Sequence, residues 1–161
     1  MKPDHTAAMA TSERLLLADI KQGASPVDAT QSASLWDMGD GVAALEIHTR
    51  LNLCDEEVVE LIARVPDRIE EGFRALVIGS DNPQAFSAGA TGDVFIDGAE
   101  HGAWDRVSSF PRHGQEALLD LRYAGFPVVT AVHGLTTGSG LRAHAPCRCG
   151  SRPRRPADWT S

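Results

Sequence analysis

The sequence predicts an α/β domain in which helices connect buried strands. Two short apolar runs flanked by turn residues, 75–79 and 127–132, have the composition of strands buried on both faces. Apolar residues recur at spacings of three and four in 55–73 and in 115–124, which indicates amphipathic helices. Strands that alternate with helices favour a sheet built with crossover connections.

A β-hairpin and the first long helix are expected early in the domain. Residues 35–48 contain two apolar segments on either side of Gly39-Asp40-Gly41, a sequence typical of a tight turn between antiparallel strands. The helix that follows begins after Asp55, a residue type favoured at the N-cap. Pro66 lies inside this helix and is expected to kink it or to split it in two, because proline has no N–H for the helix ladder.

Composition divides the chain into three regions. Residues 1–30 are polar and turn-rich, and we interpret them as a leader or linker with room for one short helix. Residues 31–140 hold the expected strands and helices, although 93–111 shows no clear pattern. Residues 141–161 hold five arginines and three prolines and, from Arg142 on, no Leu, Ile, Val, Met or Phe, so we expect an irregular basic tail.

The bulk composition excludes several kinds of partner. Lys and Arg number 15 against 22 Asp and Glu, so the net charge is −7, and such a chain is not built to bind nucleic acid. No run of about 18 apolar residues predicts a membrane span, and no secretory leader is predicted. Three cysteines suit a reducing compartment, and we expect a cytoplasmic protein.

Two loops rich in small residues are candidate ligand sites. Residues 85–90 (Ala-Phe-Ser-Ala-Gly-Ala) follow the buried strand 75–79, and residues 133–140 follow the strand 127–132. Small residues at strand ends let a ligand approach the backbone closely, and N–H groups from two such loops can form an oxyanion hole. An ordinary glycine-rich turn is the alternative interpretation of each loop.

Other chemistries fit the second loop poorly. Residues 138–143 have the glycines of a weak dinucleotide fingerprint, but these start several residues after the strand and not at its end. Ser139 is not in a nucleophile elbow, since Thr137 takes the place of its first glycine. His144, Cys147 and Cys149 have no second pair of ligands, so no metal site is expected.

In their order and spacing, these motifs resemble the crotonase (enoyl-CoA hydratase/isomerase) family. The resemblance covers roughly 35–140 and rests on hairpin, helix, strand, Phe-Ser-Ala-Gly-Ala and then Pro-Val-Val-x-Ala-Val-x-Gly-x-x-x-Gly-x-Gly. The stretch from about Leu15 through Leu35-Trp36-Asp37-Met38 to Asn52 is similar to the hydratase module of fused 3-hydroxyacyl-CoA dehydrogenase/enoyl-CoA hydratase proteins of fatty-acid β-oxidation. The resemblance to the family implies the fold, a crotonase-like spiral of ββα units that is incomplete at the C-terminus.

The same resemblance implies the ligand and the site. The substrate would be an acyl-CoA, a coenzyme A thioester, with no further cofactor. The backbone N–H groups of Ala90 and Ser139 would form the catalytic oxyanion hole. Substrate contacts are expected at Asn52, Ala88, Gly89 and Gly138.

The sequence departs from the family pattern where the hydration chemistry should lie. Hydratases of the family have Cys-Glu after the third glycine, and here the pair is Leu141-Arg142. The second catalytic glutamate, and the helices through which the family forms trimers, would lie beyond Ser161. We therefore expect a domain inactive in hydration. The alternatives are an isomerase or thioesterase that needs only the oxyanion hole, a non-enzymatic module that binds acyl-CoA or a partner, and a chain that does not fold stably.

A frameshift near Gly140 would explain the change in pattern. Suitable synonymous codons for 140–148, read one nucleotide later, give Gly-Cys-Glu-Leu-Met-Leu-His-Ala, the continuation that the family has. The shift would make the chain a truncated fragment of a longer enzyme. Resequencing the gene tests this, because no single-base correction would restore Gly-Cys-Glu if the hypothesis is wrong.

Overall fold

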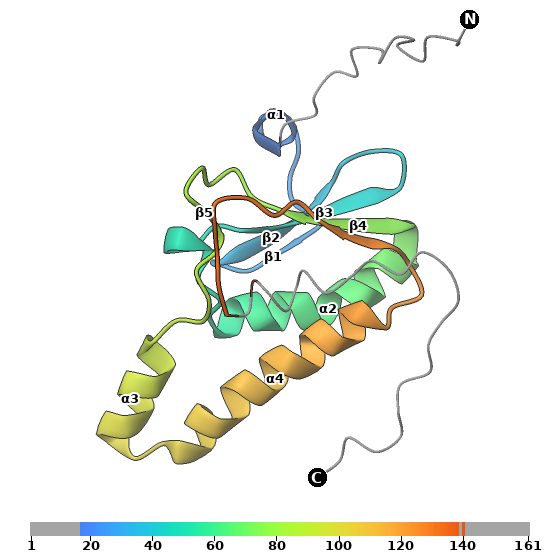
Figure 1. The fold of residues 1–161 in the computed structure, drawn as a ribbon. Helices are drawn as coiled ribbons and strands as arrows, with labels where there is room; N and C mark the ends of the chain where they lie inside the picture. The colour runs from blue at the N-terminus through green and yellow to red at the C-terminus, as the bar shows by residue number, and fades with distance from the viewer. Residues whose placement is uncertain (1–16, 139, 141–161) are drawn as a thin grey trace, which may run out of the picture.

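The protein is an α/β domain with two helices packed on one face of a mixed sheet. The computed structural model describes residues 17–138 and 140 (Figure 1). The main sheet has the strand order β1-β2-β3-β4-β6, and a second sheet pairs β5 with β7. The strands are β1 Asp28–Ala29, β2 Ala33–Asp37, β3 Val42–Ile47, β4 Ala75–Gly79, β5 Ala85–Ser87, β6 Val128–Thr130 and β7 Leu135–Thr136. The helices are α1 Leu17–Lys21, the 3₁₀ turn η1 Arg50–Asn52, α2 Glu56–Gly72, α3 Asp93–His101 and α4 Trp104–Arg122.

The hairpin, the crossover strands and the long helix lie where the sequence predicts them. The expectation that 127–132 is buried on both faces is wrong, because β6 covers only Val128–Thr130 and Val129 is 50% exposed. Strands β2 and β3 are antiparallel, whereas β4 pairs in parallel with both β3 and β6. Helix α2 begins where expected, since the Asp55 carboxylate accepts the N–H of Val58 at 2.9 Å. The apolar faces of α2 and α4 meet Leu35, Leu45 and Leu76 in one core.

Of the two effects expected of Pro66, a kink or a split, the split does not occur, because α2 runs as one element from Glu56 to Gly72. Proline removes only one backbone hydrogen bond from the ladder. Val65 and Ile69, on either side of Pro66, are both buried in the core, and this packing holds the helix together.

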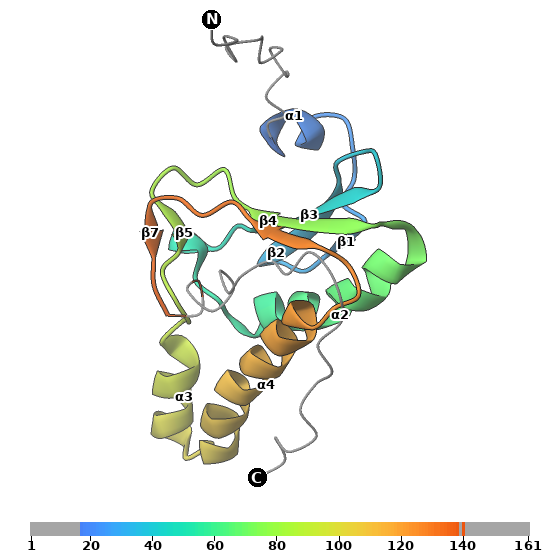
Figure 2. The same cartoon turned by 45° about the vertical axis from the view of Figure 1, so that its right-hand side comes forward.

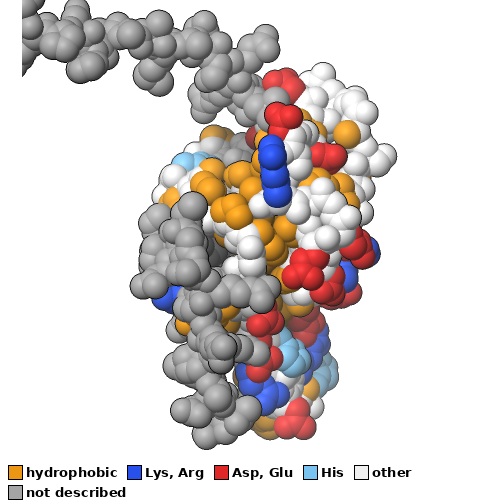
Figure 3. Space-filling view, turned by 90° about the vertical axis from the view of Figure 1, so that its right-hand side faces the viewer, with side chains coloured by type: hydrophobic (Ala, Val, Ile, Leu, Met, Phe, Trp, Pro, Cys, Tyr) orange, Lys and Arg blue, Asp and Glu red, His pale blue; other side chains and the backbone are white. Residues whose placement is uncertain are grey.

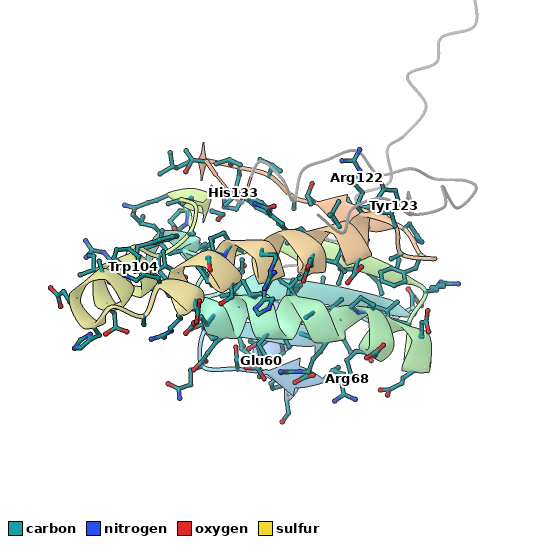
Figure 4. All side chains as sticks on the ribbon, turned by 90° about the horizontal axis from the view of Figure 1, so that it is seen from below. Glu60, Arg68, Trp104, Arg122, Tyr123 and His133 are labelled. Atoms are coloured by element: carbon teal, nitrogen blue, oxygen red, sulfur yellow. The ribbon has the colours of Figure 1, made fainter. Side chains whose placement is uncertain are left out.

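The segment without a clear pattern holds two helices. Helix α3 is capped at its C-terminal end by Gly102, which has φ +69° and takes the left-handed conformation. Helix α4 begins at Trp104, well before the predicted start at Gln115, and continues through Pro111. Figure 4 shows α2 and α4 lying side by side across the sheet, with Glu60 and Arg68 on the outer surface of α2.

Ion pairs tie the residues before the hairpin to the rest of the domain. Asp28 of β1 accepts two hydrogen bonds from Arg64, at 3.0 and 3.1 Å, and one from Arg68 at 3.1 Å. Lys21 of α1 donates to Glu46 and, at 3.1 Å, to Asp81. The short helix expected in the leader is therefore α1, and it is anchored to the sheet.

Apolar side chains also reach the surface. Figure 3 shows hydrophobic side chains between charged ones on one face of the molecule. Over the described residues, no helix has the length and apolar character needed to cross a membrane.

Candidate functional site

The two candidate loops meet where β5 and β7 end. These strands pair in parallel, and the Thr137 N–H donates to the Ser87 carbonyl at 2.9 Å (Figure 2). A Cβ built on Gly138 would lie 3.2 Å from the Gly89 Cα. Gly89 and Gly138 have φ of +100° and +55°, conformations that glycine adopts at low cost. The two loops are in backbone contact because both contact positions are glycine.

The backbone N–H of Ala90 is available to a ligand. Cys54 and Ala90 form a parallel β-bridge, in which Cys54 donates to the Gly89 carbonyl at 2.8 Å and accepts from Thr91 at 2.9 Å. This pattern turns the Ala90 N–H away from Cys54. Ala90 is exposed, and its N–H donates to no acceptor within the described part of the chain.

An apolar cavity of about 280 Å³ opens beside this residue. Strands β3 and β4 and helices α2 and α4 supply aliphatic and aromatic side chains, and the two loops supply Ser87, Ala90, Gly138 and Gly140. None of the described residues around the cavity is Asp, Glu, Lys, Arg or His. The cavity therefore suits an apolar group attached to a polar atom that can accept a hydrogen bond.

Cys54 borders this cavity, and its thiol is protonated at neutral pH. Burial, and secondarily the negative charge of Asp55, raise the pKa of Cys54 to about 12. A protonated thiol is a weak nucleophile, so the site does not support thiol chemistry. Among the described residues, no three His, Cys, Asp or Glu side chains are grouped closely enough to bind a metal ion.

Of the four predicted substrate-contact residues, only Gly138 is among the described residues that line the cavity. Gly89 and Gly138 touch at the loop junction, and Gly138 also borders the cavity. Ala88 is half-buried, and its N–H donates to the Leu51 carbonyl at 3.1 Å. Asn52 is only 1% exposed and is not among the cavity residues, because its side chain binds the backbone of β5. Ser139, the second predicted donor, and Arg142 lie outside the described residues.

Helices α3 and α4 contribute a wall that the sequence patterns did not indicate. Phe95, Phe110, Gly114 and Gln115 border the cavity, and the Phe95 and Phe110 rings meet edge to face, with 6.2 Å between their centroids. The residues at positions 110, 114, 117 and 121 have helical spacing and face inward. That spacing runs through Pro111, and following it across the proline would have found this wall.

Known proteins give the fold its context. The chain is 28% identical over 143 residues to a Bacillus subtilis (strain 168) protein named "Probable 3-hydroxyacyl-CoA dehydrogenase", a match over 89% of this chain and 18% of that protein. The chain thus spans about a fifth of the length of this curated relative. No protein-family model matches the chain.

Solved structures match over a larger share of their length. DspI of Pseudomonas aeruginosa superposes with a TM-score of 0.63 at 27% identity, over 74% of this chain and 45% of DspI. An enoyl-CoA hydratase/isomerase from Marinobacter aquaeolei superposes with a TM-score of 0.63 at 16% identity, over 71% of this chain and 46% of that one. The resemblance inferred from the two loops is confirmed: the described part of the chain has the crotonase fold of the enoyl-CoA hydratase/isomerase family.

Proposed function

We propose that this domain binds an acyl-CoA thioester, with the thioester oxygen on the Ala90 N–H and the acyl chain in the apolar cavity. The observation that carries the proposal is the N–H of an exposed residue, Ala90, which donates to no acceptor within the described residues and lies at the edge of an uncharged cavity of about 280 Å³. The names of the similar proteins, a 3-hydroxyacyl-CoA dehydrogenase and an enoyl-CoA hydratase/isomerase, support this class of ligand.

Binding would combine one directional contact with apolar burial. Each buried methylene contributes about 0.8 kcal/mol, so the acyl chain supplies affinity in proportion to its length. The thioester oxygen gains charge when the substrate enolises, and an N–H aimed at that oxygen stabilises the enolate more than the ground state. In this proposal the Ser139 N–H is the second donor.

We further propose that the domain does not hydrate enoyl-CoA. Arg142 stands where the resemblance requires the glutamate that handles water. A guanidinium stays protonated in proteins and cannot act as a base. One such group contributes about 10²–10⁴ in rate, so its replacement removes most of the activity.

Calorimetry with crotonoyl-CoA, and with free coenzyme A as the reference ligand, tests the binding. The critical variant is Ala90→Pro, which replaces by a ring carbon the N–H that serves no protein hydrogen bond among the described residues. Its control is Ala90→Gly, which keeps that N–H, and a thermal transition like that of the wild type shows that the proline variant is folded. We expect the control to bind like the wild type and Ala90→Pro to bind about tenfold more weakly. Equal affinity for all three proteins would refute the role of Ala90.

Activity assays separate the remaining possibilities. Turnover of crotonoyl-CoA to the 3-hydroxyacyl product would overturn the proposal that hydration is lost. Turnover of a 3-enoyl-CoA alone would instead identify an isomerase. A protein that binds neither thioester at millimolar concentration would contradict the proposed function as a whole.

A further inference from the structure

We infer that Asn52 is a positioning residue, which fixes the loop that carries the Ala90 N–H and does not touch the ligand. This inference rests on the proposed function. It replaces the substrate contact that the sequence suggested for Asn52, because the side chain is 1% exposed and is not part of the cavity wall.

The side-chain amide of Asn52 binds two consecutive carbonyls of β5. Its Nδ2 lies 2.9 Å from the Ala85 oxygen, 3.1 Å from the Phe86 oxygen and 2.7 Å from the Ser80 Oγ. This orientation of the amide is the favourable one. If Oδ1 took the place of Nδ2, it would lie against the Ala85 and Phe86 oxygens, and three hydrogen-bond acceptors would face one another without a donor. Strand β5 leads directly into the loop 88–90, so these bonds hold the base of that loop.

The backbone of the same turn holds the next residues of the loop. The Leu51 carbonyl accepts the Ala88 N–H at 3.1 Å, and Cys54 exchanges hydrogen bonds with Gly89 and Thr91. Residues 51–54 therefore run along the loop and bind it at both ends. Asn52 anchors the start of this contact, and the Cys54 bridge forms its end.

Asparagine suits this position in a way that most residues do not. Leu51 and Asn52 have φ of +55° and +52°, the left-handed region, which asparagine tolerates better than most side chains. Its Oδ1 is buried and has no hydrogen-bond partner in the described part of the chain, which is unfavourable. The residue thus carries an energetic cost that its donors to β5 offset, as expected of a side chain that serves loop geometry.

Two variants and a matched control test the inference in the full chain. Asn52→Gly removes the side chain while keeping a residue that tolerates positive φ. Asn52→Asp keeps the shape but places carboxylate oxygens against the two carbonyls. Ser80→Ala is the control, because it removes the third acceptor of Asn52, together with the acceptor of the Asn82 N–H, and leaves both β5 bonds in place.

Two measurements report on the loop. Hydrogen exchange followed by mass spectrometry on 85–91 reports its order in the ligand-free protein. The infrared carbonyl band of ¹³C-labelled crotonoyl-CoA reports how strongly the bound thioester is polarised. For both Asn52 variants we expect faster exchange at 85–91 with unchanged exchange in α2, a carbonyl band shifted back toward its value in water, and about tenfold weaker binding. Ser80→Ala should match the wild type in all three.

Three other results would count against the positioning role of Asn52 or against the proposed function. Unchanged exchange and an unchanged carbonyl band in a folded Asn52 variant would overturn the positioning role. Loss of the cooperative thermal transition in both variants would also overturn it, since Asn52 would then be needed for the whole fold. A wild type that binds no crotonoyl-CoA would refute the proposed function, and the exchange data alone would still test whether Asn52 orders the loop.

Discussion

Substitution of Gly134 by alanine should separate the two site loops. Gly134 has φ +55°, and a Cβ built there would lie 2.4 Å from the carbonyl oxygen of Gln84 and 2.8 Å from its carbon. Both atoms belong to the backbone just before β5, so no side-chain rotation can relieve the contact. The backbone segments of Gly134 and Gln84 must therefore move apart until the distance between the new Cβ and the Gln84 oxygen grows from 2.4 Å to 3.4 Å, where ordinary van der Waals contact begins.

Two effects add to the cost of Gly134→Ala. An L-residue in the left-handed region costs about 1–2 kcal/mol. Opening the junction also weakens the hydrogen bonds from Leu135 to Gln84, 2.9 Å, and from Phe86 to His133, 3.0 Å, each worth about 0.5–1.5 kcal/mol. We therefore expect the free energy of unfolding to fall by about 2–4 kcal/mol.

Gly102→Ala provides the matched control. Gly102 also has positive φ, +69°, but nothing lies within 4 Å of a Cβ built there, so the substitution adds backbone strain without a clash. It should cost about 1–2 kcal/mol. Urea unfolding of the three proteins measures both values, and calorimetry with crotonoyl-CoA should show weaker binding for Gly134→Ala only. Equal losses of stability in the two variants would refute the claim that this junction is tightly packed.

Three other places in the fold give predictions of their own. The two hydrogen bonds from Arg64, and then the one from Arg68, hold the pKa of Asp28 below its usual value. This cluster therefore stabilises the protein above about pH 4, and its contribution is lost as the pH falls through the lowered pKa. Asp28→Asn should accordingly lower the free energy of unfolding at about pH 7 by no more than about 1 kcal/mol, and the difference from the wild type in urea titrations should shrink toward about pH 3; a constant difference would contradict this. Because the pKa of Cys54 is about 12, peptide mapping at about pH 8 should find iodoacetamide labelling of Cys54 at least about 100-fold slower in the folded protein than in urea, and equal rates would show that the thiol is open. Replacing Leu61, which is 0% exposed, by alanine should cost about 2–5 kcal/mol in urea unfolding, and a loss below about 1 kcal/mol would mean that α2 packs loosely there.

Elements with local signals could be predicted from the sequence. The hairpin turn at Gly39–Gly41, the Asp55 N-cap and the strand at 75–79 each have a signal within a few residues, and the structure confirms all three. Strands β5 and β7 could not be predicted in the same way. They are only three and two residues long, and they form because each pairs with the other, far along the chain.

In the candidate site, too, the features with a local sequence signal could be predicted, and those set by contacts far along the chain could not. The small residues around Gly89 and Gly138 indicated two ligand loops, and the structure brings these two glycines into contact. The position of Asn52 could not be predicted, because a buried amide bound to β5 and an amide that faces a ligand have the same local sequence. Helix α4 was partly missed because Pro111 resembles a helix boundary, although tertiary packing of Phe110 carries the helix through it.

The parallel pairing of β4 with β6 also bears on the order in which the protein folds. Val77 of β4 faces Val129 of β6, and the whole of α3 and α4 lies between them in the chain. Closing so long a stretch costs chain entropy before any contact compensates for it, so such pairs form late. The hairpin β2–β3 and helix α2 depend on short separations and should assemble early. Because β7 follows β6, the ligand loops would be the last part of the domain to reach their native geometry during refolding.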